Sequence, residues 1–414
     1  MPDDSSRAFD IILWGATGFT GRLVAEYLAD HPDIDDVDWA IAGRNRDKLQ
    51  ELRTELGDEF DDLPIVVADA FDRASLDDLA RQTRVVCSTC GPYARLGDDL
   101  VAACVEAETD YCDLTGEVHW IRRIIERHHE QAEERGVRLV HCCGFDAIPS
   151  DLGISLVQSE AVDRFGNPCP EVRTIVWRIR GGMSGGTAQS FVEVIAEATR
   201  DPEVRRAVGA PYSLNPPGEQ SGPDTGLQRT PRHDGPTDTW TAPFIMAAVN
   251  EKIVRRSNAL LDYRYGRDFR YSESMRRGRG LTGALRAGTA SAGIGLFTAA
   301  LTLGPTRSLL QKFVLPDSGE GPDEEARQQG GFTVRLFGRH PDDDGDNRVV
   351  CEVGADKDPG YGATSMMIGE SALSLAFDDP DDGLDGGVLT PASAFGHTLI
   401  DRLEDAGMTF DVVG

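Results

Sequence analysis

The sequence predicts an α/β protein in which an N-terminal Rossmann domain, built on a doubly wound parallel sheet, precedes a second, α+β domain. Short apolar runs alternate with helix-like stretches up to about residue 145, which is typical of βαβ units. A glycine-rich turn follows the first apolar run. After about Gly144 apolar and polar residues alternate instead, as in strands with one face in water. The 414 residues allow two or three domains.

The Rossmann domain is expected over residues 1–146. Its strands are predicted at Phe9–Trp14, Trp39–Ala42, Pro64–Ala68, Arg84–Ser88, Thr109–Asp113 and Val137–Cys142. The helices between them are predicted at Arg22–Ala29, Arg46–Leu56, Ser75–Arg81, Asp98–Ala107 and Val118–Arg135. A helix between successive strands is the connection that a parallel sheet requires.

The second domain is expected over residues 147–389, where it would bind the substrate and form the dimer interface. Strands are predicted at Val172–Arg180, Phe332–Gly338 and Arg348–Gly354, the last two paired across the acidic turn Pro341–Asp346. Helices are predicted at Ala188–Arg200, Phe244–Leu261 and Ala363–Phe377. Residues 213–239 and 316–330 are rich in polar and turn-forming residues and are expected to form loops. A final helix is predicted at Ala392–Ala406.

The turn after the first strand is the strongest local signal for function. Its spacing is GxxGxxG, and its residues are Gly15, Ala16, Thr17, Gly18, Phe19, Thr20 and Gly21. Such a loop lets backbone N–H groups approach a pyrophosphate at the start of a helix. Three glycines alone are weak evidence, but here a strand precedes them and a helix follows. The sequence therefore predicts a dinucleotide site.

The end of the second strand selects the cofactor. An NAD site normally has Asp or Glu there to accept the ribose 2′-hydroxyl, whereas this chain has Arg44 and Asn45. An arginine binds a 2′-phosphate, which a carboxylate would repel, so NADP(H) is predicted over NAD(H). By topology alone, Asp69 is placed near the adenine. The nicotinamide ribose is placed beside the segment after the fourth strand, which consists of Thr89, Cys90, Gly91 and Pro92.

Composition bounds the remaining function classes. The formal net charge is −28, and only four of the 42 basic residues are lysines. An acidic, lysine-poor chain of this kind is typical of proteins adapted to a salt-rich (halophilic) cytoplasm, where self-repulsion is screened. It argues against sequence-independent nucleic-acid binding, which needs basic surface. The N-terminus lacks the features of a signal peptide, so a cytoplasmic protein is expected.

The eight cysteines are interpreted as reduced thiols. Cys87, Cys90, Cys142 and Cys143 lie near several histidines, but their places at predicted strand ends favour core packing, and no metal is expected.

Several separated motifs together resemble the saccharopine dehydrogenase-like oxidoreductases, and specifically the trans-acting enoyl reductase branch. These are GATGFTG, AGRN, CGPY, YCDLTGE and CGFDAIPSD, followed near the end of the chain by GGVLTP. The resemblance implies a Rossmann NADP-binding domain, an α+β second domain and a C-terminal helix (residues 390–414) that returns to the first. Bacterial relatives are associated with reducing enoyl groups on lipid-bound polyketide chains, and eukaryotic relatives with membranes and lipid droplets.

Three residues at predicted strand ends are the candidates for catalysis. Tyr93 could donate a proton, and Asp113 and Asp146 follow the fifth and sixth strands. Thr115 and Glu117 are either part of the same chemistry or the cap of the next helix. Asp151 is expected to be the N-cap of a helix. No dyad with diagnostic spacing stands out.

Two features of the second domain have alternative interpretations. The glycine-rich segment from Gly181 to Ser190 either binds an anionic or carbonyl group or forms a tight turn. Arg255 and Arg256 could contact a substrate anion, but ordinary surface arginines are the favoured interpretation.

An arginine-rich stretch from Arg264 to Arg286 precedes 20 uncharged residues, Ala287 to Thr306. This segment is either a buried interdomain or dimer helix, an interfacial helix that meets anionic lipid headgroups, or a membrane span. Peripheral membrane contact through residues 264–306 is one expectation, and a homodimer is another.

Together these observations predict an NADP(H)-dependent oxidoreductase that reduces an enoyl or carbonyl group of a small-molecule or lipid-like substrate. A saccharopine-type amino-acid dehydrogenase and a non-catalytic NADP-binding, membrane-associated protein are the alternatives.

Overall fold

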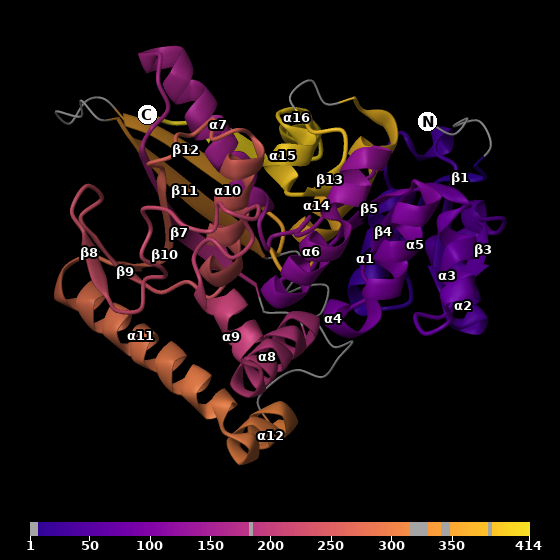
Figure 1. The fold of residues 1–414 in the computed structure, drawn as a ribbon, viewed down its shortest axis with the longest axis horizontal. Helices are drawn as coiled ribbons and strands as arrows, with labels where there is room; N and C mark the ends of the chain where they lie inside the picture. Colours follow the sequence, from indigo (N-terminus) through magenta and orange to yellow (C-terminus); the bar gives the residue numbers. More distant parts are fainter. Residues whose placement is uncertain (1–6, 182–184, 314–329, 341–347, 380–382) are drawn as a thin grey trace.

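Two seven-stranded sheets organise the protein. The computed structural model describes residues 7–181, 185–313, 330–340, 348–379 and 383–414. In Figure 1 the first sheet and its helices lie on the right, on the side of the N-terminus, and the second sheet lies on the left, on the side of the C-terminus.

The first sheet is parallel throughout, in the order β13-β6-β5-β4-β1-β2-β3. Six of its strands come from the predicted Rossmann domain: β1 (Phe9–Trp14), β2 (Trp39–Gly43), β3 (Ile65–Val67), β4 (Thr83–Ser88), β5 (Asp110–Asp113) and β6 (Arg138–Val140). Each agrees with a predicted strand to within a few residues. The seventh strand, β13 (Gly387–Leu389), comes from near the end of the chain.

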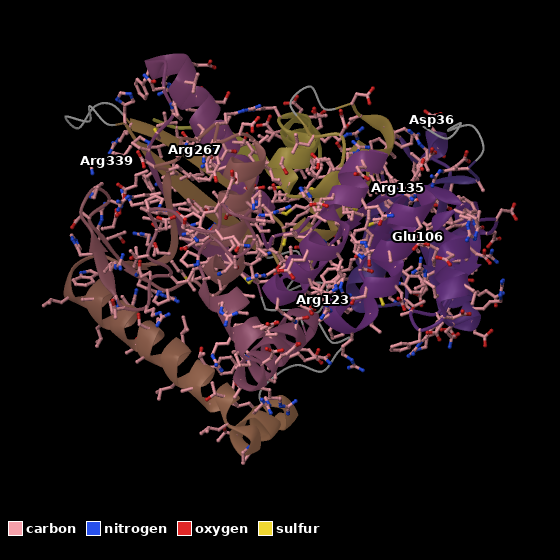
Figure 2. All side chains as sticks on the ribbon, in the orientation of Figure 1. Asp36, Glu106, Arg123, Arg135, Arg267 and Arg339 are labelled. Carbon is pink, nitrogen blue, oxygen red and sulfur yellow. The ribbon has the colours of Figure 1, made fainter. Side chains whose placement is uncertain are left out.

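Helices cover both faces of this sheet, which is why β1 is apolar on both sides. Ile11 and Leu13 belong to the core under α1 (Phe19–Ala29), α2 (Arg46–Leu56) and α14 (Gly362–Phe377), and Ile12 and Trp14 belong to the opposite core. That second core lies under α3 (Arg73–Ala80), α5 (Asp98–Ala107) and α6 (Val118–Arg135). Short 3-10 turns occur at Ile34–Asp36 and Asp58–Phe60. Arg123 of α6, labelled in Figure 2, joins this helix to α5 through Asp98, 3.0 Å away.

The second sheet is mostly antiparallel and has the order β14-β12-β11-β7-β10-β9-β8. Its strands are β7 (Glu171–Arg180), β8 (Arg232–Asp234), β9 (Thr239–Ala242), β10 (Arg270–Gly278), β11 (Gly331–Arg339), β12 (Arg348–Ala355) and β14 (Thr409–Val412). Among its described strands, β7 and β10 are the only neighbours that pair in parallel. The predicted pairing of β11 with β12 is confirmed. Both α7 (Ile148–Phe165) and α10 (Ala247–Leu260) pack on this sheet.

Four further helices among the described residues belong to this half of the chain, namely α8 (Gly185–Arg200), α9 (Pro202–Gly209), α11 (Gly280–Thr302) and α12 (Gly304–Phe313). Of these, α11 packs on β9 and β10, whereas α9 packs on α6 and α8. In Figure 1, α11 is a straight rod at the margin of the molecule that ends beside α12 and α8. It begins earlier than the uncharged segment predicted, and a new helix starts at Gly304. Residues 213–239 are not wholly a loop, because β8 and the first residue of β9 fall within them.

The end of the chain differs from the prediction. The single helix predicted at Ala392–Ala406 is divided into α15 (Pro391–Phe395) and α16 (Thr398–Asp405), because Gly396 adopts a left-handed conformation with φ of 55°. The return to the first sheet is made earlier, by α14 and β13, and the last strand, β14, pairs with β12 in the second sheet. Strand pairing between distant segments leaves no local signal in the sequence.

Candidate functional site

The glycine loop joins β1 to α1 through a tight backbone turn. Gly15 has a left-handed φ of 86°, which glycine adopts at little steric cost. The N–H groups of Gly15 and Ala16 donate to the carbonyl of Ala42 at the end of β2, at 3.0 and 3.2 Å. The Gly18 N–H then donates to the Gly15 carbonyl at 3.0 Å. The loop is therefore fixed at the carboxyl edge of the first sheet.

Gly21 lets α1 approach this turn closely. A Cβ atom on Gly21 would lie 2.2 Å from the carbonyl oxygen of Gly15 and 2.9 Å from the Cα of Ala16. The helix begins at Phe19, three residues earlier than predicted, so that Phe19, Thr20 and Gly21 form its first turn. First-turn N–H groups have no acceptor within the helix, and they carry the positive end of the helix dipole. The loop therefore fits the pyrophosphate of a dinucleotide.

Arg44 and Asn45 directly follow β2, beside this loop. Asn45 is the N-cap of α2, and its Oδ1 accepts a hydrogen bond from the Lys48 N–H at 3.1 Å. Arg44 is exposed, and within the described residues no carboxylate forms an ion pair with it. The side chain of Thr17 lies close by, since a Cβ atom on Gly43 would be 3.9 Å from Thr17 Oγ1. The Arg44 guanidinium is thus placed to bind a 2′-phosphate.

The ends of β3 and β4 meet Arg44 at the same edge of the sheet. Asp69 accepts a hydrogen bond from the Phe71 N–H at 3.0 Å, and its own N–H donates to Ser75 Oγ at 3.0 Å. Burial raises the pKa of the Cys90 thiol, as does the negative charge of Asp69, whereas the positive charge of Arg44 lowers it. Side chains after three strands therefore surround one point, as the adenosine half of a dinucleotide requires.

The segment after β4 is fastened to the glycine loop. The Thr89 N–H donates to the carbonyl of Trp14 at 2.9 Å, and Thr89 Oγ1 donates to the Trp14 and Gly15 carbonyls at 3.2 and 3.3 Å. A Cβ atom on Gly15 would lie 3.0 Å from both Thr89 Oγ1 and Cys90 Cβ. Gly91 and Pro92 then lead into the short helix α4 (Tyr93–Leu96). The structure thus brings the predicted cofactor residues of β1, β2, β3 and β4 together.

Glu117 fixes the start of α4 and reaches the second domain. Its carboxylate accepts hydrogen bonds from the Tyr93 and Ala94 N–H groups, both at 2.9 Å, and from Ser190 Oγ of α8 at 3.0 Å. Burial raises the pKa of Glu117, while the two backbone donors lower it. Its side chain therefore caps α4, not the helix α6 that follows it, and Thr115 Oγ1 accepts from the Glu117 N–H.

Tyr93 lies in the core with both polar contacts of its hydroxyl used. The hydroxyl donates to the Ser88 carbonyl at 3.1 Å and accepts from the Leu114 N–H at 3.2 Å. The ring stacks on Trp120, with centroids 5.5 Å apart. Burial, assisted by the charge of Asp113, raises the pKa of Tyr93 well above its usual value. The hydroxyl therefore holds β4 against the segment after β5.

Asp113 is fully buried and makes four hydrogen bonds. Its Oδ2 contacts the Tyr111 hydroxyl at 3.0 Å and His141 Nδ1 at 2.8 Å. Its Oδ1 accepts from the Thr115 N–H at 3.0 Å and the Cys142 N–H at 3.3 Å. These contacts join the ends of β5 and β6, so the carboxylate orders the sheet edge on which a substrate would lie.

Asp146 is the predicted catalytic residue whose carboxylate lies near both the turn after β5 and α10. It is partly exposed, and a Cβ atom on Gly116 would lie 3.9 Å from its Oδ1 and 3.8 Å from Val249 of α10. Burial, with a smaller contribution from the charge of Asp113, raises the pKa of Asp146 to about 7. The neighbouring Phe145 N–H donates to Thr364 Oγ1 at 3.1 Å. Asp146 thus has a carboxyl group with a pKa near neutrality, and it lies in a turn that the hydrogen bond to Thr364 holds in place.

Segments from the second half of the chain pack against this edge of the first sheet. The ring of Tyr361, which immediately precedes α14, packs edge-on against Phe19 of the glycine loop at 4.6 Å. Phe145 packs against Phe332 of β11 at 4.9 Å. The start of α14 and the start of β11 therefore contact the edge of the first sheet that holds the glycine loop.

Three expectations for this region were wrong. Asp151 does not cap α7, whose N-cap is Ala147; its carboxylate accepts from Ser257 Oγ and from the Ala392 N–H. Arg255 is buried in ion pairs with Asp224 and Glu251, at 2.7 and 2.9 Å.

Arg256 is also buried, and it donates to the carbonyls of Leu214 and Val388. Buried guanidinium groups of this kind join helices, strands and loops to one another, and a substrate cannot reach them. In the glycine-rich segment from Gly181 to Ser190, residues 182–184 lie outside the described part of the chain.

Sequence reasoning missed two contacts that shape the site, the Glu117–Ser190 hydrogen bond and the Phe19–Tyr361 ring pair. Each joins residues far apart in the chain, and no local pattern links them. The only signal was that Glu117 falls in YCDLTGE, one of the motifs that carry the family resemblance.

The cysteine and histidine residues do not gather as metal ligands in the described residues, where no group of three or more His, Cys, Asp or Glu side chains is arranged to hold an ion. Cys87, Cys142 and Cys143 are fully buried, and Cys87 pairs in register with Cys112 of the neighbouring strand. These thiols pack in the core.

Comparison with known proteins agrees with this geometry. Residues 11–140 match the family described as the saccharopine dehydrogenase NADP-binding domain. A Mycobacterium tuberculosis protein is 41% identical over 414 aligned residues, which cover 97% of each chain. A Mycobacterium ulcerans protein named trans-acting enoyl reductase is 37% identical, with 98% of this chain and 97% of the relative covered.

A solved structure extends the similarity of fold over the whole chain. The saccharopine dehydrogenase (L-Glu forming) of Saccharomyces cerevisiae superposes with a TM-score of 0.51, covering 98% of this chain and all of the other. Its sequence identity is 13%, so this match speaks for the fold alone.

Proposed function

Because this chain belongs to the trans-acting enoyl reductase family of saccharopine dehydrogenase-like oxidoreductases, we propose that it is an NADP(H)-dependent oxidoreductase that reduces an enoyl double bond, or a carbonyl group, of a lipid-like substrate. The observation that carries the proposal is the placement of Asp146. A carboxyl group with a pKa of about 7 lies at the carboxyl edge of the sheet that holds the dinucleotide loop.

The cofactor-binding part of the proposal rests on residues that converge on one edge. The first turn of α1 would hold the pyrophosphate, Arg44 the 2′-phosphate and Asp69 the adenine. Thr89, Cys90, Gly91 and Pro92 would line the nicotinamide ribose. When bound, NADPH supplies the hydride. The chain itself has to hold the acceptor carbon against the nicotinamide and exclude water.

Asp146 is the proposed proton donor. Reduction of an enoyl group adds a hydride to the β-carbon and a proton to the α-carbon, and a neutral carboxyl group near the acceptor can deliver that proton. Burial keeps a large share of the Asp146 carboxyl groups protonated at neutral pH. Tyr93 and Asp113, proposed with it from the sequence, are engaged in hydrogen bonds within the core. We therefore assign them to positioning the sheet edge.

Cofactor titration and turnover test this proposal. The purified protein is titrated with NADPH and with NADH by nicotinamide fluorescence, and then assayed for NADPH oxidation with enoyl thioesters of increasing chain length. We expect tighter binding of NADPH and turnover that improves with chain length.

Oxidation that requires 2-oxoglutarate and lysine instead would support a saccharopine-type dehydrogenase. Tight NADPH binding with no turnover of any acceptor would support a non-catalytic NADP-binding protein.

A cellular location and an oligomeric state are also part of the proposed function. We propose a cytoplasmic homodimer, adapted to a salt-rich interior, with no role in nucleic-acid binding and with peripheral membrane contact through residues 264–306. A lipid-like acyl chain partitions into membranes, so membrane contact would bring such a substrate to the enzyme.

A further inference from the structure

The longest helix of the second domain exposes an apolar face that no described part of the chain covers. In α11, Leu281, Leu285 and Leu296 are 90%, 70% and 73% exposed. At 3.6 residues per turn they lie within about 60° of one another around the helix axis. Leu303, at the end of the helix, is 60% exposed. We call these four leucines the leucine face.

The opposite face of α11 makes the contacts that hold the helix to the rest of the chain, so turning its leucines inward would break these contacts. Gly283, Ala287 and Leu301 are buried, and the helix contacts β9, β10 and α8. A Cβ atom on Gly283 would lie 2.4 Å from the carbonyl oxygen of Gly278, which shows how closely the helix meets the end of β10. Although α11 is long and apolar enough to cross a membrane, this packing favours a helix that lies along a surface.

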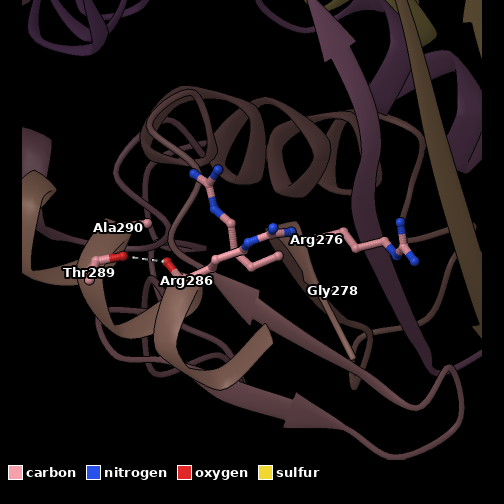
Figure 3. Close-up of a pocket in the computed structure, with 6 residues that line it drawn as sticks. Arg276, Gly278, Arg286, Thr289 and Ala290 are labelled. Atoms are coloured by element: carbon pink, nitrogen blue, oxygen red, sulfur yellow. Dashed lines mark hydrogen bonds between the residues drawn. The ribbon is translucent and has the colours of Figure 1, made fainter. Parts of the chain in front are cut away.

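An arginine-lined pocket opens between β10 and α11. Its volume is about 580 Å³, and its lining residues are Arg276, Arg277, Gly278, Arg286, Thr289 and Ala290. Figure 3 shows the pocket with the hydrogen bond from Thr289 Oγ1 to the Arg286 carbonyl, 3.1 Å long. We call this the arginine pocket.

The arginines of this pocket lack carboxylate partners. Within the described residues no Asp or Glu forms an ion pair with Arg276, Arg277 or Arg286, and the Nε atoms of Arg276 and Arg277 are buried without a hydrogen-bond acceptor. Arg276 instead lies over the ring of Trp177, 4.4 Å from its centroid. Buried cationic donors without an anion are costly, so the arginine pocket is suited to an anionic group from outside the chain.

The surrounding sequence has the opposite charge character from the rest of the protein. Residues 274–316 contain no Asp or Glu, although the chain as a whole has about one acid in every six residues. The same segment contains Arg276, Arg277, Arg279, Arg286, Arg307 and Lys312. An acid-free, cationic segment on a protein of charge −28 is complementary to an anionic surface.

We propose that the arginine pocket binds the phosphate of an anionic phospholipid headgroup while the leucine face enters the lipid beside it, so that α11 lies in the membrane interface. This rests on, and gives residues to, the membrane contact in the proposed function. Apolar burial and attraction to anionic lipid are the two contributions that interfacial helices use. The pocket adds a defined phosphate site to them.

Vesicle sedimentation tests the proposal on the full chain. Binding is measured to vesicles of phosphatidylcholine alone and of phosphatidylcholine with phosphatidylglycerol. We expect binding only to the anionic vesicles. Raising KCl from about 0.1 M to about 1 M should weaken binding without abolishing it, because the Debye length falls from about 10 Å to about 3 Å while leucine burial persists.

Matched variants separate the pocket from diffuse charge. We expect Arg277→Gln with Arg286→Gln to weaken vesicle binding about 30-fold, since each cation contributes roughly 1 kcal/mol near anionic lipid and about 1.4 kcal/mol corresponds to tenfold. Arg229→Gln with Arg232→Gln removes the same charge from exposed positions outside the pocket and should have little effect. Equal losses from the two pairs would overturn the proposal, because binding would then need no pocket.

The leucine face is tested with Leu285→Ser against Val413→Ser, which alters an exposed apolar residue at the end of the chain. Only the first should release the protein from anionic vesicles. Circular dichroism verifies that each variant is folded. No effect of Leu285→Ser on vesicle binding, or conversion of a dimer to a monomer by this variant, would overturn the proposal.

Two further measurements identify the source of the anion and separate the proposals. Inorganic phosphate is titrated by calorimetry. If phosphate binds in a way that depends on Arg277 and Arg286 while the protein does not attach to vesicles, the ligand of the arginine pocket is a soluble phosphate and the lipid proposal is overturned. NADPH affinity and enoyl turnover are measured without vesicles, so the reductase proposal stands or fails independently of membrane binding.

Discussion

Arg44 is the residue that should decide between the two nicotinamide cofactors. Its exposed guanidinium follows β2 and its charge reaches Cys90 beside the glycine loop. We predict that Arg44→Asp weakens NADPH binding about 10- to 100-fold, the effect of losing charge-assisted hydrogen bonds of roughly 1.5–3 kcal/mol. NADH affinity, measured in the same fluorescence titration, should stay nearly constant and serves as the internal control. Unchanged NADPH affinity would remove the basis for NADP(H) selection.

Asp146 should control the pH dependence of turnover. Its pKa is raised to about 7, so the carboxyl group holds a proton below that pH and loses it above. A rate that needs the protonated form is therefore full in mild acid and declines as the pH rises through about 7. We predict that Asp146→Asn lowers kcat roughly 100-fold or more and removes this decline.

The matched control for that variant is Asp78→Asn, at an exposed position of α3, which should leave the pH–rate profile unchanged. A profile of Asp146→Asn identical to that of the unaltered enzyme would mean that the proton comes from another group.

That the predicted cofactor residues meet at one sheet edge could be foreseen from the sequence, whereas the partners of the proposed catalytic residues could not, and the reason is physical. Gly15 and Arg44 sit at the ends of strands whose order follows from βα alternation, so their meeting at one edge could be predicted. The roles of Tyr93 and Asp113 depend on partners such as His141, and these pairings exist only after the chain has folded. Side-chain hydrogen bonds of this kind leave no periodic pattern in a sequence.

At the scale of elements, the contact between the glycine loop and α1 should tolerate no side chain. We predict that Gly21→Ala lowers the free energy of unfolding by about 1–3 kcal/mol, the usual cost of overpacking, and weakens NADPH binding. The cause is that its Cβ would lie 2.2 Å from the Gly15 carbonyl oxygen. Chemical denaturation and NADPH titration measure the two effects.

Gly43→Ala is the control for this prediction. It lies at the end of β2, where an added Cβ meets nothing closer than 3.8 Å, and we expect near-normal stability and affinity. If Gly21→Ala behaved like Gly43→Ala, α1 would not need its close approach to the loop.

Elements that interact locally were predictable, and those that interact at a distance were not. The helices and strands up to β6 follow from short-range apolar patterns. The division of the last predicted helix depends on the conformation of Gly396, and the place of β14 depends on pairing with β12. The sequence could not decide whether α11 is exposed, because a helix of such low polarity suits a protein core, a membrane interface or a membrane interior equally.

At the scale of the whole molecule, the charge of −28 should make stability depend on salt. We predict that Tm rises by several degrees between about 0.1 M and about 1 M KCl, because the Debye length falls from about 10 Å to about 3 Å and screens self-repulsion. Differential scanning fluorimetry measures it. Choline chloride at equal ionic strength should give a similar rise if screening is the cause. A Tm that falls with KCl would contradict adaptation to a salt-rich interior.

The way the chain returns to its first sheet also sets an order of events during synthesis. Strand β13 pairs with β6, and α14, buried along nearly its whole length, covers one face of the nucleotide-binding half. The part of that face beneath α14 therefore stays uncovered while the ribosome makes the 200 or so residues in between. Non-local closure of this kind slows folding and prolongs exposure of apolar surface. A nascent chain of this design would depend on chaperones until residue 389 has emerged.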